Sequence, residues 1–234
     1  MKIEILFPEL CNLYGDLANI KYLKKCLPDA EFIETSILDN PRFADDNIDL
    51  IYLGSMTEKT QEKVIEKLRP YTETIKKLIN ENINFLFTGN SFEILGQYIE
   101  QETGEKIECL GIINTFAKRE MFNRYNGLYL GRFNEIELVG FKAQFSLSYG
   151  DNNDNYFSIA EKGIGINRNN NLEGIKINNF IGTYILGPIL ILNPLFTKYL
   201  LQQLGVESTK IAFEQVSFEA YNQRLNELKN NIKI

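Results

Sequence analysis

Hydrophobic residues in the first hundred positions follow two different periods. Short apolar or alternating runs, typical of strands, cover residues 2–7, 30–37, 48–53 and 83–87. Between them, apolar residues recur at helical spacing in residues 17–27 and 57–79, and Pro70 is expected to kink or break the second of these helices. The resulting order of strands and helices predicts a doubly wound α/β fold with a mostly parallel sheet.

The pattern changes after residue 106. Helical spacing fades, and alternating segments separated by Gly and Asn clusters predict antiparallel strands and loops at the edge of the sheet. These segments are residues 107–116, 128–133, 136–147 and 156–160. Residues 180–186 are again strand-like, Asn193-Pro194 begins a helix that ends near Gly205, and residues 213–228 form a last helix. The 234 residues are expected to form one domain.

One junction combines a buried strand with a tight turn. The apolar run ends at Phe87, and Thr88-Gly89-Asn90-Ser91 follows. Asn90 or Ser91 is expected to cap a helix. The apolar positions of that helix are Phe92, Ile94, Leu95 and Ile99. A strand, a turn and a helix in this order form a nucleophile elbow, but its tip is Gly89, which has no side chain to react.

Composition excludes several classes of function. The net charge is −6 and the pI is about 5.0, which argues against nucleic acid or an anionic membrane surface as a partner. No apolar run approaches the roughly 20 residues that a membrane span needs. Because the start of the chain also lacks a signal-peptide pattern, a cytoplasmic location is expected.

The chain has no histidine, so the commonest general base and the commonest transition-metal ligand are both missing. The three cysteines, Cys11, Cys26 and Cys109, form an odd set without metal-like spacing. We therefore expect reduced thiols, no metal and no cofactor.

Four segments, in the right order, resemble a known family. They are residues 7–16 (Phe-Pro-Glu-Leu-Cys-Asn-Leu-Tyr-Gly-Asp), residues 89–96, Gly140-Phe141, and residues 182–190 (Gly-Thr-Tyr-Ile-Leu-Gly-Pro-Ile-Leu). They resemble the class I glutamine amidotransferases of the cobyric acid synthase type, in particular the glutaminase subunits of lipid II isoglutaminyl synthase. The resemblance implies a flavodoxin-like fold. It also implies a Cys that attacks glutamine, a His that transfers the proton, and a synthetase partner, Mur-ligase-like or another amide-forming enzyme, that receives the ammonia.

The departures from this family fall on the reacting positions. Gly89 stands where the resemblance implies the nucleophilic Cys, and Leu186 stands where it implies the catalytic His. Ala143-Gln144 replaces an Asn-His pair after Gly140-Phe141. Without nucleophile and base the covalent route is closed. The leading hypothesis is therefore a catalytically degenerate subunit that binds an amide-forming synthetase.

Two other hypotheses remain open. One is an active glutaminase with relocated chemistry, for which Cys11 is the main candidate and the hydroxyls of Thr88 and Ser91 are lesser ones. The other is a free-standing sensor of a small molecule.

A residual binding role at the elbow is physically possible. The free N–H groups of Gly89, Asn90 and Ser91 can hold glutamine, a related carboxylate, or nothing. Asp16 corresponds to the Asp of the family's Leu-Tyr-Gly-Asp segment and is expected either to bind a ligand or to cap the first helix.

Charged residues elsewhere have simpler interpretations. Glu58, Glu62 and Glu66 recur every four residues and indicate a solvated helix face. Lys118-Arg119 and Arg124 can bind a carboxylate or a phosphate, but we expect them to form a surface charge cluster.

Overall fold

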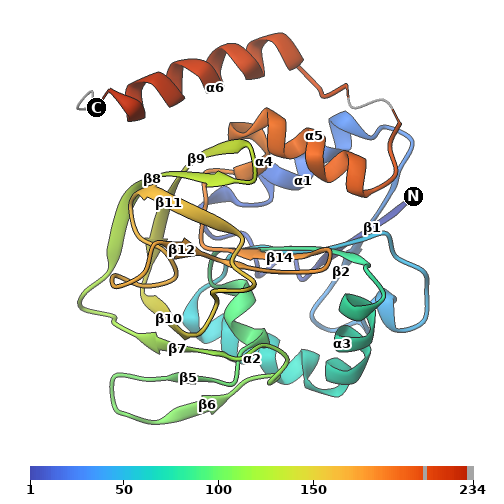
Figure 1. Ribbon diagram of the computed structural model, residues 1–234. Helices are drawn as coiled ribbons and strands as arrows, with labels where there is room; N and C mark the ends of the chain where they lie inside the picture. Colours follow the sequence, from blue (N-terminus) through green and yellow to red (C-terminus); the bar gives the residue numbers. More distant parts are fainter. Residues whose placement is uncertain (208–209, 231–234) are drawn as a thin grey trace.

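The computed structural model describes residues 1–207 and 210–230 and has a six-stranded sheet at its centre (Figure 1). The strand order is β13 (Ile175–Ile177), β14 (Phe180–Thr183), β4 (Asn84–Thr88), β3 (Leu50–Leu53), β1 (Lys2–Leu6) and β2 (Glu31–Thr35). Five strands run parallel, and β13 pairs antiparallel at one edge. Apart from β13, the order 2-1-3-4-14 is that of a flavodoxin-like sheet, which confirms the predicted fold class.

Helices cover both faces of this sheet (Figure 1). The helices on one face are α1 (Ala18–Cys26), α4 (Ile189–Leu192) and α5 (Pro194–Gln203); those on the other are α2 (Glu58–Leu68), the 3-10 turn η3 (Arg69–Tyr71) and α3 (Thr72–Asn80). Short 3-10 turns η1 (Leu13–Gly15) and η2 (Arg42–Ala44) lie in loops, and α6 (Glu214–Lys229) packs beside α4, α5 and β9. The break at Pro70 is confirmed, since η3 separates α2 from α3.

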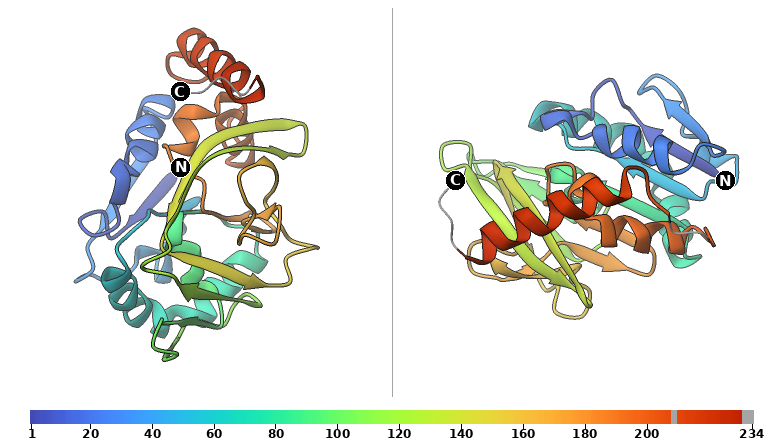
Figure 2. Two further views of the ribbon diagram at one scale, coloured as in Figure 1. Left: turned by 90° about the vertical axis from the view of Figure 1, so that its left-hand side faces the viewer. Right: turned by 90° about the horizontal axis from the view of Figure 1, so that it is seen from above.

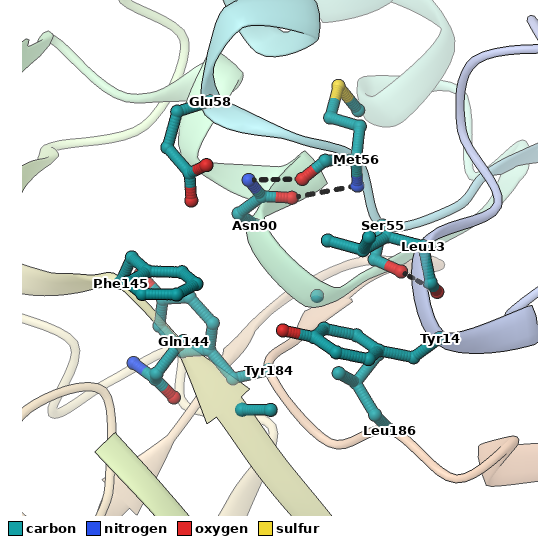
Figure 3. A pocket seen from close by; sticks show the side chains of 12 residues that line it. Leu13, Tyr14, Ser55, Met56, Glu58, Asn90, Gln144, Phe145, Tyr184 and Leu186 are labelled. Atoms are coloured by element: carbon teal, nitrogen blue, oxygen red, sulfur yellow. Dashed lines mark hydrogen bonds between the residues drawn. The ribbon is translucent and has the colours of Figure 1, made fainter. Parts of the chain in front are cut away.

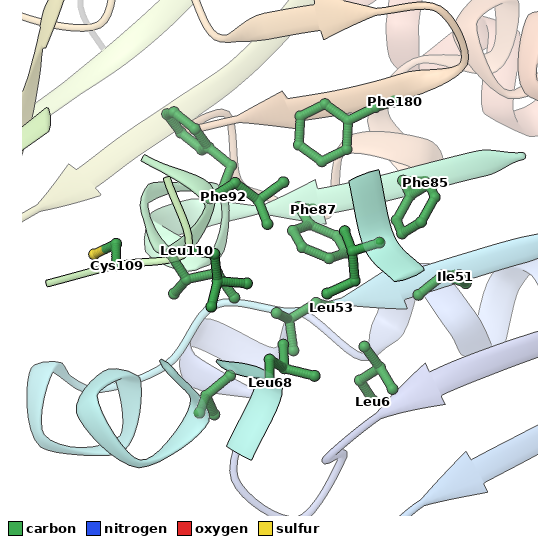
Figure 4. Close-up of a cluster of buried hydrophobic side chains, with 14 of the residues drawn as sticks. Leu6, Ile51, Leu53, Leu68, Phe85, Phe87, Phe92, Cys109, Leu110 and Phe180 are labelled. Carbon is green, nitrogen blue, oxygen red and sulfur yellow. The ribbon is translucent and has the colours of Figure 1, made fainter. Parts of the chain in front are cut away.

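The central strand β4 is buried on both faces. Phe85 and Phe87 belong to the hydrophobic cluster that includes residues of α2 and α3 (Figure 4). Leu86 belongs to the cluster on the opposite face of the sheet. The rings of Phe87 and Phe180 meet edge to face with their centroids 5.5 Å apart. Burying one such ring stabilises the fold by about 1.5–3 kcal/mol, so the carboxyl end of β4 rests on a rigid support.

The antiparallel strands form two further sheets. One contains β6 (Lys106–Glu108), β5 (Tyr98–Glu100), β7 (Thr115–Arg119) and β10 (Ser146–Gly150); the other contains β9 (Ile136–Gln144), β8 (Tyr125–Phe133), β11 (Ser158–Lys162) and β12 (Leu172–Glu173). The expectation that they extend the edge of the parallel sheet is wrong, because only β13 does so. Figure 2 shows β8 and β9 (yellow-green) curving from this region to the C-terminal helix. An alternating pattern identifies a strand but not its partner.

The segment after β4 also differs from expectation. Residues Gly89–Leu95 form a 3-10 helix, η4, and Ile99 lies in β5 instead of continuing a helix. The chain turns at Gly96, where a Cβ atom would lie 2.7 Å from the carbonyl oxygen of Thr115. This close approach of two backbones ends the helix one turn earlier than the apolar spacing indicates.

Among the described helices, none combines the length and the apolarity that crossing a membrane requires.

Candidate functional site

Gly89 occupies the tip of a sharp turn between β4 and η4. Its φ angle is +64°, in the left-handed region that glycine adopts without strain. The predicted strand-to-helix junction at residue 89 is therefore confirmed. A Cβ atom at this position would lie 2.4 Å from Cβ of Ser55, which is too close for any side chain unless Ser55 moves.

Leu186 faces this turn from the loop after β14. It is buried, and the built Cβ of residue 89 would lie 3.5 Å from its Cδ2 atom. The parallel pairing of Thr88 with Thr183 sets the ends of β4 and β14 side by side. Leu186 also exchanges two backbone hydrogen bonds with Phe141, of 2.8 and 3.2 Å. The structure thus brings together Gly89 and Leu186, the two positions that the sequence singled out.

Ser55 is a residue of this site that sequence reasoning did not identify. Its hydroxyl donates to the carbonyl of Leu13 at 2.7 Å, and its backbone N–H donates to Asp16 Oδ2 at 2.8 Å. Its Cβ fills the space that a side chain at residue 89 needs. Its position in the sequence could have pointed to the site, because segment 54–57 follows a buried strand and ligands of such sheets bind at the carboxyl ends of the strands.

Gly89 lines a small pocket. Figure 3 shows the side chains around it. Its volume is about 20 Å³, enough for roughly one water molecule. Its walls include Tyr14, Glu58, Asn90, Gln144, Phe145 and Leu186. Glu58 is the only charged side chain among the lining residues, so the pocket offers no cation to a carboxylate ligand.

Two of the four expected binding residues line this pocket and two do not. Gly89 and Asn90 line it, but the Asn90 amide is engaged with the backbone N–H and carbonyl of Met56, at 3.1 and 2.9 Å. Asp16 and Ser91 are buried beneath the turn. The Ser91 hydroxyl is 2.7 Å from the carbonyl of Thr88, to which it donates.

Asp16 ties the ends of three strands together. Its carboxylate accepts from Ser55 N at 2.8 Å, from Thr88 Oγ1 at 2.5 Å and from Asn19 Nδ2 at 2.9 Å. Burial raises the pKa of Asp16, and the hydrogen bonds from Thr88 and Ser55 oppose that shift. Among the described residues, no backbone N–H group of α1 donates to the Asp16 carboxylate. Asp16 therefore does not cap that helix and instead holds the loops beneath the pocket.

Comparison with known proteins decides the family. Residues 2–193 match the CobB/CobQ-like glutamine amidotransferase domain. The chain belongs to this family.

Two curated relatives are similar over nearly their whole length. The first is the lipid II isoglutaminyl synthase (glutamine-hydrolyzing) subunit GatD of Streptococcus pneumoniae, 24% identical over 98% of this chain and 92% of the relative. The second is the subunit of the same name from Staphylococcus aureus, 27% identical over 87% of this chain and 83% of the relative.

Solved structures support the fold. A crystal structure of a glutamine amidotransferase matches with a TM-score of 0.59 at 13% identity, covering 87% of this chain and 99% of that one. A glutamine amidotransferase from Thermotoga maritima matches with a TM-score of 0.51 at 11% identity, covering 98% of this chain and 92% of that one.

In this CobB/CobQ-like domain the candidate substitute nucleophiles are buried and occupied. The Thr88 hydroxyl donates to Asp16, and the Ser91 hydroxyl donates to backbone carbonyls. Cys11 is fully buried, outside the pocket, with its Sγ 4.0 Å from the sulfur of Met56. Burial raises the pKa of the Cys11 thiol, which suppresses the reactive thiolate.

A second buried carboxylate, that of Glu93 in η4, lies behind the pocket. Its Oε1 atom accepts from the hydroxyls of Tyr184 and Ser146, both at 2.5 Å, and its Oε2 atom accepts from Gln61 Nε2 at 2.8 Å. Burial raises the pKa of Glu93. This network fixes η4 against β10 and the loop after β14, but it leaves no group free to act in the pocket.

Lys142 follows Gly140-Phe141 and is also fully buried. Its ammonium donates to the carbonyls of Ile164 and Gly165, at 2.8 and 2.7 Å, and forms an ion pair with Glu173. Burial lowers the pKa of Lys142, whereas the charge of Glu173 opposes that shift. The pair holds the second antiparallel sheet against β14, since Glu173 also accepts from Thr183 Oγ1 at 2.9 Å.

The expected basic cluster does not form one patch. Lys118 pairs with Glu100 at 3.1 Å on one side of β7, whereas Arg119 is buried on the other side and pairs with Glu62 at 2.7 Å. Arg124 stacks over the ring of Phe145. The reading of Lys118-Arg119 as a surface charge cluster is therefore wrong for Arg119, because a strand directs successive side chains to opposite faces.

Within residues 1–207 and 210–230, no three Cys, Asp or Glu side chains gather closely enough to hold a metal ion.

Proposed function

We propose that this CobB/CobQ-like domain is a non-hydrolysing subunit of an amide-forming synthetase complex. It acts as one domain over residues 1–234, in the cytoplasm, docked on a Mur-ligase-like or related synthetase. The relatives support this assignment because both are named as a subunit of lipid II isoglutaminyl synthase. We therefore place the chain in lipid II amidation, as a subunit that binds and regulates the synthetase.

One observation carries the non-hydrolysing role. Gly89 and Leu186 face each other where this family's reacting pair is expected, and neither has an atom that can attack an amide or accept a proton. No histidine exists anywhere in the chain to replace the base. The hydroxyls of Thr88 and Ser91 donate to Asp16 and to backbone carbonyls, so in the described part of the chain neither is an activated nucleophile near the pocket.

The pocket also supports a role without glutamine turnover. A volume of about 20 Å³ holds no amino acid unless Tyr14 or Leu186 moves. Glu58 would repel the carboxylate of glutamine, and no cation lines the pocket to offset that repulsion. Binding of glutamine or a related carboxylate at Gly89, Asn90 and Ser91 therefore needs a rearranged pocket.

A glutaminase assay tests the proposal. The purified chain, alone and with its co-expressed synthetase subunit, is incubated with glutamine, and released glutamate is measured. The pneumococcal GatD relative, whose name describes it as glutamine-hydrolyzing, serves as the positive control. We expect glutamate release at the level of the buffer blank. Release of glutamate with equimolar ammonia would overturn the non-hydrolysing role.

The two alternative functions, relocated chemistry and a free-standing sensor, predict different experimental results. Relocated chemistry through Cys11 requires that a measured glutaminase activity is lost in a Cys11→Ala variant. The free-standing sensor requires that no synthetase subunit co-purifies with the chain. Stable co-elution of the chain with a Mur-ligase-like subunit in size-exclusion chromatography supports the docked role.

A further inference from the structure

No strand among residues 1–207 and 210–230 pairs with the outer edge of β2. β2 ends the six-stranded sheet, and among the described residues only β1 pairs with it. The N–H of Glu31 and the carbonyl of Thr35 bond to residues that flank β1, at 3.0 and 2.8 Å. Because alternate residues of a strand direct their backbone groups to opposite sides, Phe32 and Glu34 present theirs away from β1. These groups are available to a further strand.

An open groove lies between β2 and the loop that follows it, and Glu34, whose backbone groups face away from β1, is one of its lining residues. Its volume is about 630 Å³; β2 supplies one wall and residues 39–46 supply the other. The buried carboxylate of Glu4 holds that second wall in place, because it accepts from the backbone N–H groups of Arg42 and Phe43 at 2.6 and 2.8 Å. The same carboxylate accepts from the Thr35 hydroxyl at 2.6 Å, which joins the two walls.

The charge along the groove is predominantly negative. Its acidic lining residues are Glu34, Asp39, Asp45 and Asp46, and Arg42 is its one basic lining residue. Glu34 and Asp46 are already paired with lysines outside the groove, at 3.0 and 2.7 Å. Asp39 and Asp45 are exposed and form no ion pair with any described residue. Beside them, Leu38 is 87% exposed, a large apolar side chain without cover.

We propose that an extended, lysine- or arginine-bearing segment of a partner protein binds in this groove and pairs with β2 as a seventh strand of the sheet. Backbone hydrogen bonds to Phe32 and Glu34 supply affinity, as in other cases of strand addition. Basic side chains on one face of the segment meet Asp39 and Asp45, and alternate apolar side chains cover Leu38. Because the carboxylates of Asp39 and Asp45 form no ion pair with described residues, they favour a basic segment over an acidic one.

A synthetic peptide probes this surface directly. The probe is a fluorescently labelled nonapeptide of alternating lysine and valine, titrated into the full-length chain and followed by anisotropy. One control peptide alternates glutamate and valine, and the other is the lysine–valine peptide with alternate backbone amides N-methylated. We expect binding of the first peptide only, weakening about tenfold between low and physiological salt. In amide hydrogen exchange, the N–H of Glu34 becomes protected when the peptide binds.

Two matched variants separate strand pairing from charge. Glu34→Pro removes the outward N–H without touching the bonds to β1, and Glu34→Ala loses the same ion pair with Lys24 but keeps that N–H. We expect Glu34→Pro to weaken peptide binding about tenfold relative to Glu34→Ala. Asp39→Asn with Asp45→Asn should weaken binding similarly and flatten its salt dependence. Thermal melts establish that each variant remains folded.

Several outcomes overturn the proposal. They are equal binding of the glutamate or N-methylated peptide, an unchanged affinity in Glu34→Pro, protection of amides elsewhere than β2, or no binding at millimolar peptide. Glutaminase activity plays no part in these measurements, so their result is independent of the proposed function of the pocket.

Discussion

Leu186 Cδ2 lies 3.5 Å from the point that a Cβ atom of Gly89 would occupy. The parallel register of β4 and β14, in which Thr88 is paired with Thr183, fixes this approach. The backbone at residue 89 therefore has the geometry of a nucleophile elbow, including the φ of +64° at its tip, while neither Gly89 nor Leu186 has an atom that can attack an amide or accept a proton. This register depends on the buried core of β4 and β14 and not on the side chains at residues 89 and 186.

The contact between Gly89 and Ser55 predicts a strong effect of Gly89→Ala. The alanine adopts a left-handed φ, which costs about 1–2 kcal/mol. Its Cβ would also lie 2.4 Å from Cβ of Ser55, and such overpacking costs about 1–3 kcal/mol more. We expect the free energy of unfolding in urea to fall by roughly 2–5 kcal/mol.

Two further variants isolate the clash. Gly205→Ala has a similar φ of +76° but open space around it, so it should lose only the backbone part. Ser55→Gly combined with Gly89→Ala should recover the overpacking part, seen as a coupling of about 1–3 kcal/mol in a double-mutant cycle. If Gly89→Ala costs no more than Gly205→Ala, Ser55 does not fill the site.

Much of this scaffold is predictable because it depends on local pattern. Strand β4, the turn at Gly89 and the break at Pro70 follow from apolar runs and from residues with special backbone angles. Two neighbouring features, the end of η4 and the role of Ser55, cannot be predicted from local pattern. Ile99 matches helical spacing, yet the backbone contact of Gly96 with a distant strand ends the helix first. Ser55 is an ordinary strand-end residue until the fold places it against Gly89.

The two buried thiols, Cys11 and Cys109, are predicted to be unreactive in the folded chain. Burial raises the pKa of Cys11 and raises that of Cys109 to about 12, so neither forms thiolate at neutral pH. We expect iodoacetamide to label both slowly in buffer and completely in urea, as measured by peptide mass spectrometry. A Cys11→Ala variant should lose about 1 kcal/mol of stability and leave glutamate release at background. Rapid labelling of Cys11 under native conditions would support relocated chemistry instead.

The ion pair of Lys142 with Glu173 is predicted to be strongly coupled. Both side chains are fully buried, so Lys142→Met leaves an unpaired carboxylate at 173 and should lower the free energy of unfolding by about 3–5 kcal/mol. Adding Glu173→Gln removes that buried charge and should restore a large part of the loss. The exposed pair of Lys77 with Glu81 is the control, because Lys77→Met should change stability by less than about 1 kcal/mol. Equal effects at the two sites would contradict the coupling.

Buried charges were the least predictable part of the site. Glu93 lies between Phe92 and Ile94, and Lys142 lies between Phe141 and Ala143 in an alternating strand. A one-dimensional pattern assigns such residues to the solvent side. Their partners, Tyr184 and Glu173, are 91 and 31 residues away in the chain, so only the folded structure shows that their hydrogen bonds are satisfied.

Glu93 is predicted to make stability depend on pH. Burial raises its pKa in the folded state above the ordinary value of 4.5, so the folded chain binds a proton more tightly than the unfolded chain. Its contribution to stability is therefore fully present below pH 4.5 and is lost as the pH rises through the folded pKa. Glu93→Gln keeps an oxygen to accept from Tyr184 and Ser146 but cannot titrate, so its unfolding free energy should fall less steeply as the pH rises above 4.5. Urea unfolding across this range measures the difference, and Glu73→Gln on the exposed face of α3 is the matched control. Parallel pH profiles for Glu93→Gln and the unmodified chain would show that Glu93 stays ionised in the fold.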